Sequence, residues 1–171
     1  MSSRYRLQIA ALTAVFALGL GLQNAHSAEL VAFPEAFSAG TIVVRTSERR
    51  LYLVLANGRA LRYLVGVGQV GRQWVGSSSI EAKFLGPNWA PPAEIRRDKP
   101  GLPAVIPGGS PSNPMGAAAL TLAGGSYAIH GTNAPDSIGG FVSYGCIRML
   151  NADILDLYNR IKVGTGVIVT P

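Results

Sequence analysis

Cysteine is almost absent from this chain of 171 residues, because Cys146 is the only one. Exported proteins usually join their cysteines in pairs, and a single cysteine cannot form a bridge within its own chain. A redox centre built from paired cysteines is excluded for the same reason. Cys146 is therefore an inert buried thiol, an intermolecular link or a reactive nucleophile.

Long apolar runs are also missing. The one extended run, residues 9–22, falls short of the roughly 20 apolar residues that span a bilayer. It follows Arg4 and Arg6 and precedes small residues, which is the order of a secretory signal peptide. We therefore expect residues 1–28 to be a signal peptide and the protein to be exported without a stable membrane anchor. An uncleaved N-terminal anchor is the alternative.

Histidine is scarce as well. His26 falls within the expected signal peptide, which leaves His130 as the only imidazole beside Cys146 in the remaining chain. That pair is too small a ligand set for a structural zinc site, and a catalytic zinc would need a carboxylate as a further ligand. We predict no metal and no cofactor. The candidate reactive groups that remain are one thiol and one imidazole.

Neither sign of charge dominates the chain. Lys and Arg number 15 against 9 Asp and Glu, and removing Arg4 and Arg6 lowers the net charge from +6 to +4. An excess this diffuse argues against a nucleic-acid partner, but it suits a protein that works beside an anionic polymer.

The hydrophobic pattern after the expected signal peptide predicts a single, mainly β domain. Residues 41–46 and 50–56 are rich in β-branched and aromatic side chains, and Asn57-Gly58 supplies the positive φ angles of a two-residue hairpin turn. Apolar residues occupy both sides of the second strand, so we expect both of its faces to be covered. Further strands are expected at residues 59–68, 80–85, 117–125, 126–132 and 167–170.

The proline-rich residues 87–116 interrupt this β pattern. A connection of that length is usually functional or disordered, and Trp89 and Met115 favour an ordered loop that packs over something. The densest charged run of the chain, residues 94–99, lies within it and mixes both signs. We interpret that run as a solvated part of the loop.

One helix is expected, and it follows Cys146. Residues 151–164 carry apolar side chains at helical spacing. Asn151 is the expected cap at its start, and Gly164 is the expected end.

The surroundings of Cys146 allow two interpretations. A thiol attacks as its thiolate and needs a base, and His130 at the end of an expected strand is the imidazole available. Gly145 lets the backbone approach a substrate closely, and backbone N–H groups there could stabilise an oxyanion. Cys146 could equally be plain core, since free cysteine is among the most often buried residues. The residues alone leave both interpretations open.

Several motifs in a fixed order resemble the L,D-transpeptidase catalytic domain, the YkuD domain, of bacterial cell-wall enzymes. They are HGT at residues 130–132, S-x-G-C-I-R-M at 143–149, and the stretches PNWAPP, PGGSPSNPMGAAALTL, YAIHGTNAPDSIG and GCIRMLNADILDLY. The resemblance implies a β-sandwich with one main helix following the catalytic cysteine. It assigns residues 41–171 to the catalytic domain after a short N-terminal segment, 29–40, and places the protein in the periplasm at the cell wall.

The resemblance also implies a mechanism. Cys146 would attack a carbonyl of a peptidoglycan stem peptide, usually that of diaminopimelate, and release the terminal D-alanine. An amine of a neighbouring stem, or of an outer-membrane protein, would then resolve the thioester. His130 would be the base, the Gly131 carbonyl would orient it, and the backbones of Tyr144, Gly145 and Cys146 would donate to the oxyanion. A carboxypeptidase or amidase on the same scaffold and a non-catalytic wall-binding module are the alternatives.

Substrate contacts are expected from residues around the same motifs. Arg148 could hold a stem carboxylate through paired hydrogen bonds; the alternative is a structural salt bridge to Asp136, Asp153 or Asp156. The other expected substrate contacts are Tyr144, Ser143, Asn113 and Trp89.

Tyr144 departs from the family pattern, which usually reads SHGC where this chain has SYGC. A phenol cannot act as the base at neutral pH, although its hydroxyl can still hydrogen-bond a substrate group. We therefore expect this tyrosine to affect the choice of acyl donor, with bonds of the 3-3 or the 1-3 type, more than activity itself.

Overall fold

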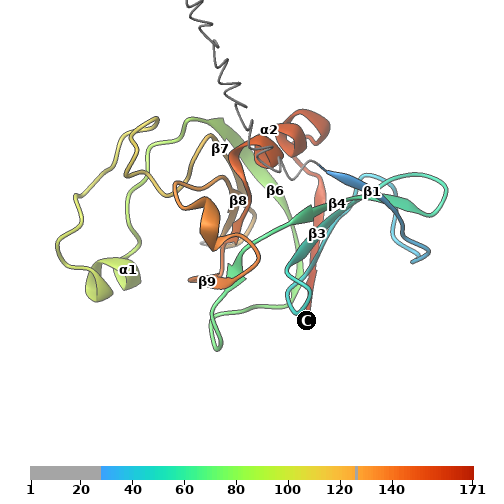
Figure 1. The fold of residues 1–171 in the computed structure, drawn as a ribbon, viewed down its shortest axis with the longest axis horizontal. Coiled ribbons are helices and arrows are strands. Elements are labelled where there is room, and N and C mark those ends of the chain that lie inside the picture. Colours follow the sequence, from blue (N-terminus) through green and yellow to red (C-terminus); the bar gives the residue numbers. More distant parts are fainter. Residues whose placement is uncertain (1–27, 126) are drawn as a thin grey trace, which may run out of the picture.

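The computed structural model describes residues 28–125 and 127–171 (Figure 1). The expected signal peptide, residues 1–28, lies outside these residues except for Ala28. Among the residues that the structure describes, no helix combines the length and the apolar composition needed to cross a membrane.

The chain is mainly β with one main helix, which confirms the expected fold class. A nine-stranded sheet has the order β1-β4-β3-β2-β11-β6-β7-β8-β10, and β5 pairs with β9 separately. The strands are β1 Glu29–Ala32, β2 Ile42–Arg45, β3 Arg50–Val54, β4 Arg59–Leu64, β5 Val67–Gly68, β6 Gly76–Leu85, β7 Ala118–Leu122, β8 Ala128–His130, β9 Phe141–Ser143, β10 Ile147–Arg148 and β11 Gly166–Thr170. The helices are α1 Ala93–Asp98, the short 3-10 helix η1 Pro135–Ser137 and α2 Asn151–Arg160.

Strand β6 joins the two halves of the sheet. Its first residues pair with β11 and its later residues pair with β7, and the register shifts between Ile80 and Ala82. Such a bulge bends a strand, so the halves fold over a shared core in which Ile42 and Leu51 of one half join Leu120 and Ile129 of the other.

The predicted hairpin forms between β3 and β4, but Val54 pairs with Ala60, so the connection is longer than the predicted two-residue turn. Asn57 and Gly58 have φ angles of 62° and 65°, which are the left-handed values that a tight turn between twisted strands requires. On β3, Leu51 faces the main core, whereas Tyr52 packs in a second buried cluster on the opposite face. Phe33 of the N-terminal segment belongs to that second cluster, and β1 pairs with β4.

Helix α2 follows the cysteine as predicted, but its ends differ from the prediction. The N-cap position is Leu150, and Asn151 makes no cap. The helix ends at Arg160, before Gly164, and Lys83 of β6 donates to the carbonyls of Tyr158 and Ile161 at 2.6 and 2.7 Å. A lysine from another strand thus satisfies carbonyls that a helix end leaves free.

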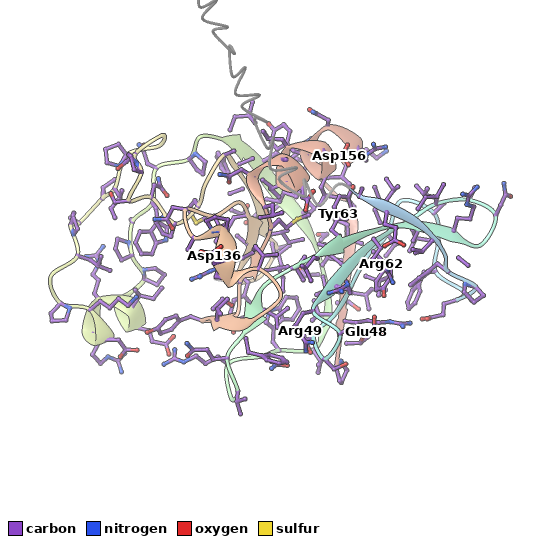
Figure 2. The ribbon with its side chains drawn as sticks, viewed as in Figure 1. Glu48, Arg49, Arg62, Tyr63, Asp136 and Asp156 are labelled. Carbon is purple, nitrogen blue, oxygen red and sulfur yellow. The ribbon has the colours of Figure 1, made fainter. Side chains whose placement is uncertain are left out.

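Tyr63 connects β4 to the same helix. It is 1% exposed, and its hydroxyl donates to Asp156 at 2.7 Å. Figure 2 shows its side chain reaching from the sheet toward Asp156 on α2. Because Asp156 also pairs with Arg160, its carboxylate is held by a strand and by its own helix.

Residues 87–116, here called the lid, extend sideways from β6 and β7 and carry α1 (Figure 1). Residues 94–99 include no buried residue, as predicted for a solvated run, but most of them form α1 rather than a loop. Asn113 orders the lid from within: its amide nitrogen faces the carbonyls of Pro87, Ile106 and Pro107 at 2.9 to 3.2 Å.

Candidate active site

Parallel pairing of β8 with β10 brings the cysteine and the histidine into one site. The register sets Ile147 beside Ile129 and Arg148 beside His130. Cys146 immediately precedes β10 and therefore lies next to the strand that ends in His130. All three of Cys146, His130 and Arg148 line a single cavity, together with Trp89 and Tyr144. The strand pairing, rather than the spacing of the two residues along the chain, thus brings Cys146 and His130 together.

His130 is a buried, neutral imidazole. It is 4% exposed, and its Nδ1 lies 2.7 Å from the Gly131 carbonyl oxygen. A carbonyl only accepts, so Nδ1 carries a proton and Nε2 is the basic nitrogen. Burial, followed by the charge of Arg148, lowers the pKa of His130 to about 4, against hydrogen bonds to the Gly131 and Pro114 carbonyls that favour the imidazolium.

Cys146 is a partly exposed thiol. Burial raises its pKa, against a backbone hydrogen bond from Ala128 and the charge of Arg148, which both favour the thiolate. Within the described residues the thiol makes no hydrogen bond to His130. Such contacts often tighten only when a substrate binds. Both pKa shifts favour the neutral thiol and the neutral imidazole in the resting site.

Residues 143–146, here called the catalytic loop, are braced by Ser143. This serine is 1% exposed; its hydroxyl donates to the Cys146 carbonyl at 2.6 Å and accepts the Gly145 N–H at 3.1 Å. Ser143, an expected substrate contact, thus also supports the loop, and it lines the Cys146 cavity. Because the Gly145 N–H has an acceptor, the Cys146 N–H is the better candidate for the oxyanion.

Gly145 is required by its own backbone and by its neighbour. Its φ is 120°, a conformation that side chains rarely adopt, and a Cβ there would lie 2.3 Å from Cε1 of Tyr127. The glycine therefore allows the catalytic loop to close against the Tyr127 ring.

Arg148 brings a buried positive charge to the cavity. Its Nε is buried without a hydrogen-bond partner, and burial lowers its pKa. No ion pair of Arg148 is present in residues 28–125 and 127–171, and Asp156, one of its expected partners, pairs with Arg160 instead. A guanidinium in this setting is suited to a carboxylate ligand, because buried charges require partners.

Tyr144 ties the catalytic loop to the lid. Its hydroxyl donates to Asp98 of α1 at 2.7 Å, and the Arg72 guanidinium lies 3.9 Å from the centre of its ring. Arg72 also pairs with Glu94 and, at 3.4 Å, with Asp98. We call these four side chains the latch.

The two remaining expected substrate residues differ in placement. Trp89 lines the cavity. Asn113 is only 2% exposed, and its side chain is used entirely by the backbone of the lid, including the Met115 N–H, which its Oδ1 accepts at 2.9 Å. We therefore expect Asn113 to shape the lid rather than to touch substrate.

Asn151 and Glu81 were missed as site residues. Asn151 Oδ1 accepts the N–H groups of Ala117 and Thr132, both at 3.0 Å, and so holds the backbone that follows His130. An asparagine at the start of a helical pattern is expected whether it caps the helix or binds distant backbone. The sequence therefore does not distinguish these two roles. Glu81 lies at the bulge of β6 and lines the Cys146 cavity, and the sequence of this strand does not reveal where the bulge falls.

The described residues contain no group of three or more His, Cys, Asp or Glu side chains that could hold a metal ion. The groups that the site presents are a thiol, an imidazole, a guanidinium and the N–H groups of the catalytic loop. These are the groups that acyl transfer through a thioester requires.

Fold and site together define a β-sandwich protein with a cysteine and histidine pair in one cavity. Over residues 39–169 the chain matches the family of YkuD, the L,D-transpeptidase catalytic domain. The chain belongs to this family, as its motifs predicted.

Similar proteins are also named as L,D-transpeptidases. The chain is 47% identical over 135 residues to the probable L,D-transpeptidase ErfK/SrfK of Salmonella typhimurium, covering 74% of this chain and 42% of that protein. It is 43% identical over 135 residues to the probable L,D-transpeptidase YbiS of Escherichia coli, covering 74% and 43%. A solved L,D-transpeptidase of Mycobacterium tuberculosis shares the fold with a TM-score of 0.59 at 17% identity, covering 77% of this chain and 57% of that one. The chain thus spans less than half the length of the two relatives.

Proposed function

We propose that this protein is an L,D-transpeptidase that crosslinks peptidoglycan stem peptides through a thioester on Cys146. The observation that carries the proposal is the meeting of Cys146, His130 and Arg148 in one cavity. Arg148 would hold a stem carboxylate, and the catalytic loop would present backbone N–H groups to the attacked carbonyl oxygen.

The chemistry divides into two balanced transfers. His130 Nε2 takes the thiol proton as Cys146 Sγ bonds to the carbonyl carbon, and collapse of the oxyanion expels the D-alanine amine, which takes that proton from His130. An acceptor amine then attacks the thioester carbon and gives its proton to His130. The C–S bond breaks, and the thiolate regains the proton.

Glu81 favours an amine as the acceptor. It is the bulged residue of β6 and faces the same cavity as Cys146, and a carboxylate there attracts an ammonium group.

Stem peptides are the partners we propose, with an outer-membrane protein as an alternative acceptor and no nucleic acid. The bond that we propose is of the 3-3 or the 1-3 type. Export through residues 1–28 would bring the protein to the periplasm.

The decisive experiment is mass spectrometry of the products after the purified protein is incubated with a disaccharide-tetrapeptide from peptidoglycan. We expect a crosslinked dimer, whose fragmentation locates the new bond, and none with Cys146→Ala. A shortened stem without dimers would establish a hydrolase, and unchanged substrate would favour a wall-binding module.

A second readout tests the activated thiol directly. A carbapenem presents a strained amide that resembles the scissile bond, so we expect it to acylate Cys146 and to increase the intact mass of the protein. The Cys146→Ala protein should keep its original mass. An unchanged mass for the wild-type protein would count against an activated site.

A further inference from the structure

We propose that Trp74 is a positioning residue that holds the oxyanion-stabilising peptide of the catalytic loop in its working orientation. The inference rests on the proposed function, because it concerns the thioester chemistry of Cys146. Trp74 lies between β5 and β6, in a glycine- and serine-rich stretch far along the chain from the cysteine.

A single hydrogen bond defines the contact. The Trp74 indole Nε1–H donates to the Gly145 carbonyl oxygen at 3.1 Å. An indole N–H can only donate. It can therefore pair with a carbonyl oxygen at this position, but not with an N–H. The indole therefore selects one of the two orientations of the peptide between Gly145 and Cys146.

That orientation decides where the Cys146 N–H points. In a trans peptide the carbonyl oxygen of one residue and the N–H of the next point in opposite directions. Holding the Gly145 carbonyl on Trp74 therefore directs the Cys146 N–H away from the indole, and this N–H has no acceptor among the described residues. In the flipped peptide the Gly145 oxygen would take the place of the N–H and repel a developing oxyanion.

The indole is itself held rigidly. Its ring is stacked on Tyr127, with centroids 5.3 Å apart and planes 3° from parallel, and both residues pack against the main core. The Tyr127 ring lies against Gly145, where no Cβ fits. Ser143 holds the neighbouring Gly145 N–H and Cys146 carbonyl. Trp74 adds the restraint that these contacts lack, on the Gly145 carbonyl.

Two reagents separate this role from others. A carbapenem reacts through attack on a carbonyl, which creates an oxyanion. Iodoacetamide reacts by displacement, in which a C–S bond forms as the C–I bond breaks, and no oxyanion appears. A residue that orients the oxyanion donor affects the first reaction alone, whereas a residue that only supports the fold or the thiol affects both.

The test compares Trp74→Phe with the wild-type protein in both reactions at one pH. Phenylalanine keeps an aromatic ring for Tyr127 and removes the N–H. Loss of a whole oxyanion donor slows catalysis about 100- to 1,000-fold, and a peptide that is only less well oriented should lose part of this, so we expect the saturating acylation rate to fall about 10- to 100-fold. The half-saturating carbapenem concentration and the alkylation rate should stay within about twofold.

Tyr52→Phe is the matched control. It also removes one donor from a largely buried aromatic side chain, the bond from Tyr52 to Glu48 at 2.6 Å, but in the second cluster. We expect wild-type rates in both reactions. Equal losses in both reactions for Trp74→Phe, or no loss in either, would overturn the inference. A wild-type protein that is alkylated but never acylated would overturn the proposed function, and the inference with it.

Discussion

At the scale of single residues, the site keeps a thiol and an imidazole neutral until substrate arrives. Burial moves the two pKa values apart, raising that of Cys146 and lowering that of His130. A thiolate and imidazolium ion pair would require the opposite shifts. His130 thus acts as a base within the reaction rather than as a permanent counterion.

This arrangement predicts the pH dependence of alkylation. Iodoacetamide reacts with the thiolate, so its rate should still be rising above about pH 8.5, the ordinary pKa of a free cysteine. The measurement is the rate of mass increase as a function of pH. His130→Gln should leave that profile nearly unchanged while it abolishes acylation by a carbapenem. A plateau reached below neutral pH would show that the ion pair exists at rest.

Glu81 carries the second prediction at this scale. If its carboxylate attracts the acceptor ammonium, Glu81→Gln should slow transpeptidation about fivefold, because an exposed ion pair contributes up to about 1 kcal/mol. Acylation by a carbapenem should not change, since that step involves no acceptor. Glu35→Gln, which alters a surface carboxylate paired with Arg45, is the control. A slower acylation with Glu81→Gln would contradict the acceptor role.

At the scale of elements, the latch explains what Tyr144 does in place of the usual histidine. It connects the catalytic loop to α1 of the lid through Asp98, and Arg72 joins both. Sequence patterns predicted neither α1 nor this contact. A short helix without buried residues has no apolar period to recognise, and its stabilising partners lie outside it.

Tyr144→Phe should loosen the lid without unfolding the protein. It keeps the ring beside Arg72 and removes the hydroxyl that donates to Asp98. Backbone amides of residues 93–98 should exchange hydrogen faster, as mass spectrometry of peptide fragments can show, while the midpoint of urea unfolding should hardly change, because the contact is exposed. Tyr158→Phe, a change on α2, should leave exchange in the lid unaltered. Unchanged exchange in Tyr144→Phe would contradict the latch.

At the scale of the whole molecule, the buried His130 links stability to pH. Its pKa is lowered from 6.5 to about 4, so between these values the unfolded chain binds more protons than the folded protein. Stability therefore rises with pH across this window and falls as the solution is acidified. The contribution is at most about 3.5 kcal/mol, from about 1.4 kcal/mol for each unit of pKa.

Urea unfolding at a series of pH values should show this loss. Between pH 6.5 and about 4, His130→Gln should lose less stability than the wild-type protein, because glutamine does not titrate. Carboxylates with lowered pKa values, such as Glu48 and Asp156, titrate in both proteins and cancel in the difference. Parallel curves for the two proteins would mean that His130 is accessible to protons in the fold.

The sequence by itself determined most of the longer strands and the family. β-Branched and aromatic residues and the Asn57-Gly58 turn predicted the hairpin of β3 and β4, because strands and turns depend on near neighbours. The chain has one cysteine and, outside the expected signal peptide, one histidine, which reduced the candidate reactions to those of a thiol and an imidazole. The ordered motifs identified the family.

Only the tertiary structure decided which polar groups remain free for a substrate. Ser143 and Asn113 use theirs within the catalytic loop and the lid, and Asn151 clamps distant backbone instead of capping its helix. Trp74 reaches Gly145, and Tyr144 reaches Asp98. The partners of Asn151, Trp74 and Tyr144 are far away along the chain, and a local pattern carries no information about contacts that form only when separate segments pack together.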